Sequence, residues 1–175
     1  VNAPGISQGL CGDHRPGHFA GVATIVTKLL LQALPDCAVF GEKDYQQLQV
    51  IRRLTLDLDI PVQIIGLPTV READGLAVSS RNAYLGPADR AAAPKMHAIL
   101  NDVAKRVRAG EAPATAVAAG HEALATAGFS PIDYLEVRTA ETLLRLDQAP
   151  AGAPLRVLAA AWLGETRLID NIPLE

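Results

Sequence analysis

Two short apolar runs, residues 37–40 and 62–66, each follow a segment whose apolar residues recur at helical spacing. The first helical segment covers residues 18–34, and the second starts near Lys43. Turn residues bound both runs, which predicts two buried strands. The order helix, strand, helix, strand indicates an α/β fold with a parallel sheet. Two strands are too few for a stable parallel sheet, so we expect partner strands from elsewhere. No downstream segment continues the alternation of helix and strand.

Side-chain spacing predicts which faces of the second helix are buried. Its expected inner face carries four apolar residues, Leu48, Ile51, Leu54 and Leu58. Its more polar faces are expected to carry Gln46, Gln49, Arg53 and Asp57. The Gly- and Pro-rich residues 1–17 are predicted to be loop.

The pattern changes after Pro68. Residues 69–86 read as a polar loop with short extended pieces, followed by an Ala-rich helical hairpin. The predicted helices cover residues 87–109 and 112–127, and the predicted strands cover residues 132–138, 155–162 and 166–172. A tight turn at 163–165 joins the last two strands. We therefore expect an α/β unit with parallel strands at 1–69. A small α+β domain with a three-stranded antiparallel sheet is expected at 70–175.

Charge and composition exclude several classes of protein. The chain has 175 residues, of which 49% are hydrophobic and 20% charged, so disorder is excluded. Sixteen Lys plus Arg face nineteen Asp plus Glu without a basic block, which disfavours nucleic-acid binding. No apolar run approaches the roughly 20 residues that cross a bilayer. Cys11 and Cys37 lack disulfide or metal spacing, so we expect a reducing cytoplasm.

The first candidate site is the junction between the strand at 37–40 and the following helix. Gly41 allows close backbone approach, and a helix N-terminus offers N–H groups and a positive dipole end to phosphate. Lys43, Asp44 and Gln47 are three or four positions apart, so they can gather at one ligand. The same residues also fit a plain helix start, with Asp44 as N-cap and Lys43 as a surface lysine.

The second candidate lies in the loop between the two halves. Ser79, Ser80 and Arg81 place two hydroxyls beside a guanidinium, a combination that suits a polyphosphate. The alternative is a surface loop with serines as turn formers. Arg15 and His18 flank the turn at 16–17 ahead of the first helix, and they suit either a carboxylate or a local cap with a surface charge. His97 and His121 are expected at the surface, and no metal site is predicted.

Three segments together closely resemble the pantothenate synthetases, the family of pantoate–β-alanine ligases. They are HFAGVATIVTKLL at 18–30, FGEKDYQQLQVIRRL at 40–54 and PTVREADGLAVSSRNAYL at 68–85. DYLEVR at 133–138 and TRLIDNI at 166–172 also resemble the family's C-terminal domain. The order and spacing agree over nearly the whole chain. The resemblance implies that residues 1–69 are a remnant, the C-terminal half, of a Rossmann-like nucleotide-binding domain that binds ATP and pantoate.

The resemblance implies a cytoplasmic, homodimeric ligase of pantothenate and coenzyme A biosynthesis that uses ATP with Mg²⁺. In that family, pantoate attacks the α-phosphorus of ATP, and pyrophosphate leaves an enzyme-bound pantoyl adenylate. The amine of β-alanine then attacks the adenylate, which yields pantothenate and AMP. Such chemistry depends on positioning and on neutralising phosphate charge.

The resemblance also assigns residues. The implied catalytic residues are Lys43, Ser79, Ser80 and Arg81. The implied ATP-binding residues are Gly41, Glu42, Lys43, Asp44, Val70, Val78, Ser79, Ser80 and Arg81. Gln47 is implied to hydrogen-bond pantoate, and the other implied substrate-binding residues are Val22, Ile25, Val26, Arg15 and His18.

One departure from the family pattern is larger than a substitution. The family's N-terminal portion carries a His-x-Gly-His-type motif for ATP phosphates, and the sequence shows none. We therefore expect a C-terminal portion of the enzyme that catalyses poorly alone. The alternatives are a non-catalytic folding or interaction fragment, or another nucleotidyltransferase of the same superfamily.

Overall fold

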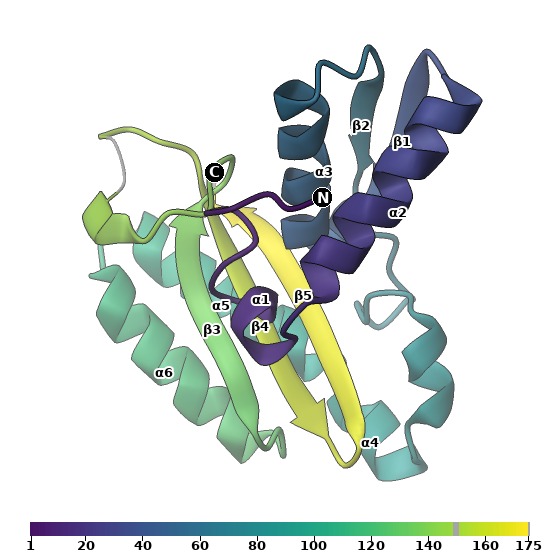
Figure 1. The fold of residues 1–175 in the computed structure, drawn as a ribbon. Coiled ribbons are helices and arrows are strands. Elements are labelled where there is room, and N and C mark those ends of the chain that lie inside the picture. Colours follow the sequence, from purple (N-terminus) through teal and green to yellow (C-terminus); the bar gives the residue numbers. More distant parts are fainter. Residues whose placement is uncertain (149–150, 175) are drawn as a thin grey trace. The chain divides into compact units, whose positions relative to one another are not determined.

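The computed structural model describes residues 1–148 and 151–174. The chain divides into two compact units, Val1–Thr69 and Val70–Glu175, and each is considered by itself (Figure 1). The first contains a two-stranded parallel sheet and the second a three-stranded antiparallel sheet. The α/β fold class predicted from the sequence is confirmed. No helix of the described residues is long and apolar enough to cross a membrane.

The first unit has the predicted alternation of helices and strands. Its elements are α1 (Cys11–His14), α2 (His18–Ala33), β1 (Cys37–Gly41), the 3-10 helix η1 (Glu42–Asp44), α3 (Tyr45–Asp57) and β2 (Gln63–Leu67). The strands pair in parallel, with Cys37 opposite Gln63 and Gly41 opposite Leu67. Helix α1 interrupts the segment that was expected to be loop throughout. Helix α3 contacts α2 and both strands.

Helix α2 forms because its apolar residues repeat at three- and four-residue steps. Phe19, Ala23, Thr27 and Leu30 are its buried residues. The helix ends where Leu34 takes a left-handed conformation (φ 43°) and donates its N–H to the Leu30 carbonyl at 2.8 Å. The predicted helix is confirmed to within one residue.

Helix α3 buries more of its circumference than its apolar pattern indicates. Leu48, Ile51 and Leu54 are buried as expected. The prediction for Leu58 is wrong: it lies beyond the helix end and is 46% exposed. Gln46 and Gln49 are buried, so their placement on a polar face was also wrong. The backbone of the N-terminal segment binds the Gln46 side chain, and α2, β1 and β2 also contact the helix, so it is covered on more sides than its apolar residues indicate.

The two strands of the first unit are less buried than predicted. Cys37, Val39 and Gly41 are exposed, whereas Ala38 and Phe40 between them are half-buried. Alternate residues of a strand point to opposite faces, so this pattern shows one face covered and the other open. In β2 the three central residues are all half-buried and its two ends are exposed. The expectation of fully buried strands is therefore wrong for both, although of these two described strands only β1 shows an open face.

The second unit places a helical pair beside the antiparallel sheet. Its elements are η2 (Ser80–Tyr84), α4 (Pro87–Ala92), α5 (Lys95–Arg108), α6 (Pro113–Thr126), β3 (Ile132–Thr139), η3 (Leu146–Gln148), β4 (Leu155–Leu163) and β5 (Thr166–Leu174). The three strands and the tight turn after Leu163 are confirmed. The single helix predicted over 87–109 is wrong. It is split into α4 and α5 next to Pro94, since proline lacks the N–H of a continuous helix.

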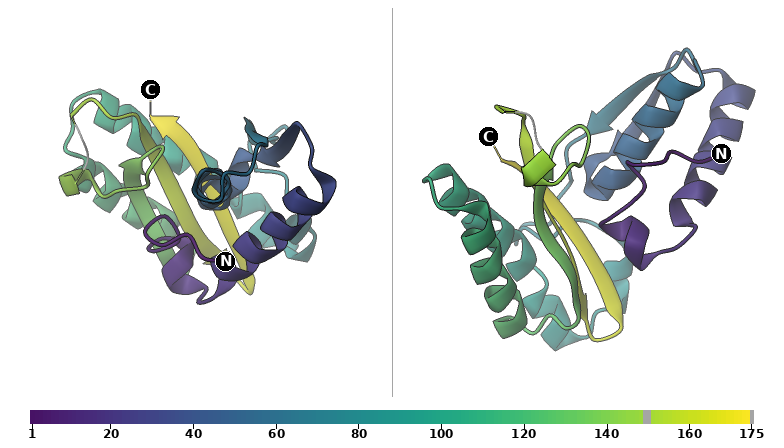
Figure 2. Two further views of the ribbon diagram at one scale, coloured as in Figure 1. Left: turned by 45° about the horizontal axis from the view of Figure 1, so that its top comes forward. Right: turned by 60° about the vertical axis from the view of Figure 1, so that its left-hand side comes forward.

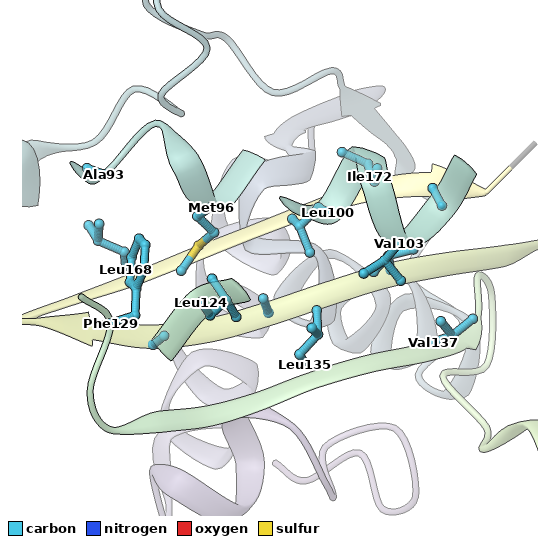
Figure 3. Packing of buried hydrophobic residues seen from close by; sticks show 14 of the residues in the cluster. Ala93, Met96, Leu100, Val103, Leu124, Phe129, Leu135, Val137, Leu168 and Ile172 are labelled. Carbon is cyan, nitrogen blue, oxygen red and sulfur yellow. The ribbon is translucent and has the colours of Figure 1, made fainter. Parts of the chain in front are cut away.

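The core of the second unit lies between the helices and one face of the sheet. Helix α5 contacts β4 and β5, and α6 contacts β3 and α5. Figure 2 shows both helices on the same side of the sheet. In Figure 3, Leu100 and Val103 of α5 and Leu124 of α6 pack toward Leu135 and Ile172 of the strands. This packing shows which face of the sheet Ile172 occupies, and every second residue of β5 counted from it lies on that same face.

Candidate functional site

The junction between β1 and α3 holds the first group of candidate residues. β1 ends at Gly41, η1 covers the next three residues, and α3 starts at Tyr45. Lys43 and Gln47 are both half-buried, while Gly41 and Asp44 are exposed. The strand therefore ends beside the N-terminus of a helix of 13 residues, whose first N–H groups lack partners within the helix. This is a geometry that suits an anionic group.

The sequence left two interpretations of this junction open: a ligand site, or a plain helix start with Asp44 as N-cap. Asp44 occupies the position before α3, but its side chain accepts no capping hydrogen bond there. Gly41 has an ordinary extended conformation (φ −74°, ψ 135°), and a Cβ added to it would meet nothing within 4 Å. Its backbone is therefore open to a ligand, although its conformation does not demand glycine. The capping function considered for Asp44 is wrong.

Glu42 is turned toward the second strand. A Cβ added at Gly66 of β2 would lie 3.3 Å from Glu42 Oε1, 3.2 Å from Arg52 Nη2 and 2.9 Å from Leu48 Cδ2. Three side chains thus approach the backbone of Gly66, and a residue with a Cβ there would require Leu48 to shift. The sequence reasoning missed this use of Gly66, although a lone Gly inside an apolar strand is a signal of close approach.

Arg15 and His18 contact each other at the start of α2. Arg15 Nη1 donates to His18 Nε2 at 3.0 Å, and both side chains are half-buried. Gly17 between them takes a left-handed conformation (φ 78°) directly before the helix. The turn therefore pairs the cation with the imidazole. Such a pair fits both a local cap and a joint contact to a carboxylate.

The apolar residues assigned to the substrate wall lie off the packed face of α2. Val22 and Val26 are half-buried and one turn apart, and Ile25 is 53% exposed. The buried face of the helix consists of Phe19, Ala23, Thr27 and Leu30. The three residues therefore lie outside the fully buried face of α2.

In the second unit, residues 70–78 form a short hairpin, called here the 70–78 hairpin. Val78 N–H donates to the Val70 carbonyl at 2.9 Å, and Glu72 N–H donates to the Leu76 carbonyl at 2.8 Å. Gly75 closes the turn with a left-handed conformation (φ 92°) and donates to the Glu72 carbonyl at 2.9 Å. The hairpin thus brings together the two candidate residues at its ends, Val70 and Val78.

The phosphate candidates follow the hairpin directly. Val70 is 71% and Val78 is 50% exposed, and Ser80 and Arg81 are also exposed. The Ser79 hydroxyl accepts the N–H of Arg81 at 3.2 Å, which starts η2. The alternative interpretation, in which the serines act as turn formers, therefore applies to Ser79. The Arg81 side chain lies on the surface of the unit, where a phosphate can reach it.

Polar contacts that the sequence reasoning missed hold this segment. Asn82 Nδ2 donates to Glu72 Oε1 and to the Ala77 carbonyl, each at 3.1 Å. Arg90 binds Glu72 and Asp74 at 2.6 Å each. Hydrogen bonds from Arg90 and from the Leu76 N–H lower the pKa of Asp74. The only sequence feature that could have indicated these contacts is the presence of acidic residues next to a turn, with arginines farther along the chain.

His97 is not the free surface residue that was expected. Its side chain is 25% exposed, and its Nδ1 lies 3.7 Å from Asp170 Oδ2. Burial, and secondarily the charge of Arg71, lower its pKa, while Asp170 raises it. Within 1–148 and 151–174, no three His, Cys, Asp or Glu side chains are placed to hold a metal ion together.

Comparison with known proteins identifies the family. A parallel α/β unit with an open strand–helix junction belongs to the broad class of α/β folds that bind ligands outside the carboxyl ends of their strands. The family model described as pantoate-beta-alanine ligase matches residues 1–173, and the chain belongs to that family. The resemblance seen in the sequence is confirmed.

Individual relatives agree with this assignment. The chain is 59% identical to a pantothenate synthetase of Paramagnetospirillum magneticum and 56% identical to one of Azotobacter vinelandii. All of this chain aligns in both comparisons, with 61% of each relative. The chain therefore spans about three fifths of the length of these curated relatives.

Solved structures match as well. A pantothenate synthetase from Thermus thermophilus is 47% identical, with a TM-score of 0.89 over 99% of this chain and 62% of that one. A pantoate-beta-alanine ligase from Francisella tularensis is 31% identical, with a TM-score of 0.75 over 99% of this chain and 57% of that one. The Francisella protein is described as complexed with beta-gamma ATP and beta-alanine.

Proposed function

We propose that the chain contributes to the ATP-dependent condensation of pantoate with β-alanine, and that its two candidate segments bind ATP. The observation that carries the proposal is the family match over residues 1–173, in a chain that keeps both segments. The Francisella relative, described as complexed with beta-gamma ATP and beta-alanine, supports the choice of substrates. Pantothenate formation in the cytoplasm by a homodimer belongs to the same proposal.

The proposed reaction has two steps. A pantoate carboxylate oxygen attacks the α-phosphorus of ATP, the bond to the β-phosphate oxygen breaks, and pyrophosphate leaves. The β-alanine amine then attacks the acyl carbon of the pantoyl adenylate, the acyl–oxygen bond breaks, and AMP and a proton leave. Neither step needs a protein nucleophile, so the protein acts by orientation and by balancing phosphate charge.

The residues divide into charge-balancing and orienting groups. Lys43 stands next to the α3 N-terminus, where a cation adds to the attraction of the helix for phosphate. Ser79, Ser80 and Arg81 offer hydroxyl and guanidinium donors to phosphate oxygens. Gln47 would donate to pantoate, and the backbone of Val70 would contact the adenine. Val22, Ile25 and Val26 would face the apolar part of pantoate.

In this proposal Mg²⁺ arrives as part of the substrate, bound to ATP phosphates. Mg²⁺ is usually held by one or two carboxylates together with substrate phosphates. The carboxylates of Glu42 and Asp44 lie in η1, but the described part of the chain has no preassembled group of metal ligands. We assign no reaction step to a metal held by the protein.

Titration calorimetry tests the binding part of the proposal. ATP with excess Mg²⁺ is titrated into the purified 175-residue chain, and GTP with Mg²⁺ serves as the matched control. We expect saturable heat for ATP and a weaker response for GTP. Absence of saturable ATP binding at millimolar nucleotide would contradict the proposal for this chain.

A second assay addresses turnover. Pantothenate formation from pantoate, β-alanine and ATP is measured for the chain and for the whole Azotobacter relative under the same conditions. Since the chain spans 61% of that relative, we expect much slower turnover by the chain. Equal rates would contradict the expectation that the chain catalyses poorly alone.

A further inference from the structure

The 70–78 hairpin is tied to the sheet of its own unit by an ion pair between residues 99 positions apart in sequence. Arg71 Nη1 lies 2.7 Å from Asp170 Oδ2, and Arg71 Nη2 lies 2.9 Å from Asp170 Oδ1. The side chains are 19% and 4% exposed. Two parallel N–H···O bonds fix both the distance and the orientation of the guanidinium. This pair is therefore a rigid link and not a surface contact.

The position of Asp170 in β5 makes the link firm. Leu168 and Ile172, two residues away on either side, belong to the core between the sheet and the helices. Alternation along the strand puts Asp170 on that same face. Its Oδ1 also accepts the N–H of Asn171 at 2.8 Å. A carboxylate in this setting needs a cation, and Arg71 supplies it.

The turn of the hairpin rests on the same cluster. Arg71 Nη1 donates to the Gly75 carbonyl at 3.1 Å, so one guanidinium binds both the turn and β5. A Cβ added to Gly75 would lie 3.2 Å from His97 Cδ2, which shows how closely the turn approaches α5. Arg71, Asp170 and His97 thus form a seat for the turn, and we call them the hairpin seat.

The far end of the hairpin carries the candidate nucleotide residues. Val70 and Val78 are joined by a backbone hydrogen bond, and Ser79 follows Val78 directly. Resting on the proposed function, we propose that Arg71 is a positioning residue for nucleotide binding. Its pairing with Asp170 holds the 70–78 hairpin, and thereby sets where the Val70 backbone and the segment 78–81 are presented to ATP.

The test uses three variants of the full chain. Arg71→Met removes the guanidinium, and Arg71→Lys keeps the charge but not the two-pronged geometry. Arg106→Met is the matched control, because Arg106 binds Asp102 at 2.7 Å within α5 of the same unit, and that pair is exposed. The control also removes an arginine and its ion pairs, with Asp102 and at 3.8 Å with Glu111, but at a distance in sequence from the hairpin.

The first readout is hydrogen exchange of single backbone amides, measured by NMR. In Arg71→Met we expect the amides of Glu72, Gly75 and Val78 to exchange about tenfold faster or more, because a local opening frees them. Amides of β4 and α6 should keep their rates. Arg71→Lys should be intermediate, and Arg106→Met should match the wild type. Unchanged hairpin rates, or equal acceleration throughout the unit, would overturn the proposal.

The second readout is ATP–Mg²⁺ affinity by calorimetry. We expect Arg71→Met to weaken binding by about tenfold or more, since a small displacement of positioning groups has large effects. Arg71→Lys should retain part of the wild-type affinity. Arg106→Met should bind ATP–Mg²⁺ as tightly as the wild type. Freed hairpin amides with unchanged affinity would overturn the positioning function.

The two readouts separate this proposal from the proposed function. If the wild-type chain binds no ATP, the proposed function fails for this chain. The exchange rates then still decide whether Arg71 holds the hairpin. If the wild type binds ATP and Arg71→Met binds equally well, the proposed function stands and the positioning proposal is overturned.

Discussion

The side-chain amide of Gln46 is hydrogen-bonded to the backbone of Cys11, whose N–H donates to Gln46 Oε1 at 3.0 Å. The other end of the same amide donates to the carbonyls of Ile6 at 3.2 Å and Gly9 at 3.1 Å. Gln46 is 4% exposed and lies in the first turn of α3. One amide therefore holds the N-terminal segment against the helix that also carries Gln47.

Gln46→Leu should destabilise the first unit. The change leaves a buried N–H and several carbonyls without their partner, which costs about 1–3 kcal/mol. Gln49→Leu is the matched control: Gln49 is also 4% exposed, but its Nε2 makes no hydrogen bond within the described residues. We expect a smaller effect there. Limited proteolysis of the segment before α2, with urea unfolding followed by circular dichroism, measures both. Equal losses in the two variants would contradict the prediction.

Lys43→Met should weaken ATP–Mg²⁺ binding, if the proposed function holds. The variant removes one charge-assisted contact of about 1.5–3 kcal/mol, which corresponds to about 10- to 100-fold in affinity. Lys28→Met on α2 is the control, since Lys28 is exposed and lies outside the candidate residues. Calorimetry measures both, and the folded state is checked by urea unfolding. Wild-type affinity in Lys43→Met would remove Lys43 from the proposed site.

Two helical glycines should respond in opposite directions to alanine. A Cβ at Gly120 of α6 would lie 2.6 Å from Leu135 Cδ2 and 2.7 Å from Val103 Cγ2, and both side chains are buried. Gly120→Ala therefore overpacks the core and should cost about 1–3 kcal/mol. A Cβ at Gly21 of α2 would meet nothing within 4 Å. Gly21→Ala should then stabilise the first unit by about 0.5–1 kcal/mol, because alanine favours the helix.

Urea unfolding measures the two glycine variants separately. Trp162 is the single tryptophan and lies in the second unit, so its fluorescence follows Gly120→Ala. Circular dichroism follows Gly21→Ala. A stable Gly120→Ala variant would show that Leu135 and Val103 have room to move.

The local sequence pattern predicted most of the fold, because each element is marked by its own hydrophobic periodicity or by Gly and Pro at its ends. Helical spacing predicted α2, an Ala-rich composition predicted α6, and a Gly-containing turn predicted the β4–β5 hairpin. The error at Pro94 was also local, since a proline eight residues into a predicted helix is itself a breaker. The resemblance supplied the family, and the family match confirmed it.

The residues that support the candidate segments were not predictable in this way. Arg71 and Asp170 are far apart in sequence, and although both lie in segments that carry the family resemblance, no local pattern indicates that they pair. Gln46 looked like a solvated polar residue, although its amide is used by the backbone of another segment. Such contacts depend on tertiary placement, which hydrophobic periodicity does not encode. The functional assignments of Lys43, Ser79 and Arg81 remain predictions.

The stability of the second unit should depend on pH through His97. Burial, and then the charge of Arg71, lower the pKa of His97 below its ordinary 6.5, and Asp170 opposes them. The unfolded chain therefore binds more protons than the folded chain as the pH falls through about 6.5, so the free energy of unfolding decreases. The pKa of Asp74 is lowered from 3.8, and that carboxylate stays charged over this window.

His97→Gln removes this titration, so its free energy of unfolding should fall less between about pH 7.5 and about pH 5.5 than that of the wild type. Urea unfolding followed by Trp162 fluorescence at both pH values gives the two differences. The comparison uses the change with pH within each variant, because the substitution also alters packing against the hairpin turn. If the wild type and His97→Gln lose the same free energy, His97 is not the group that links protonation to unfolding of this unit.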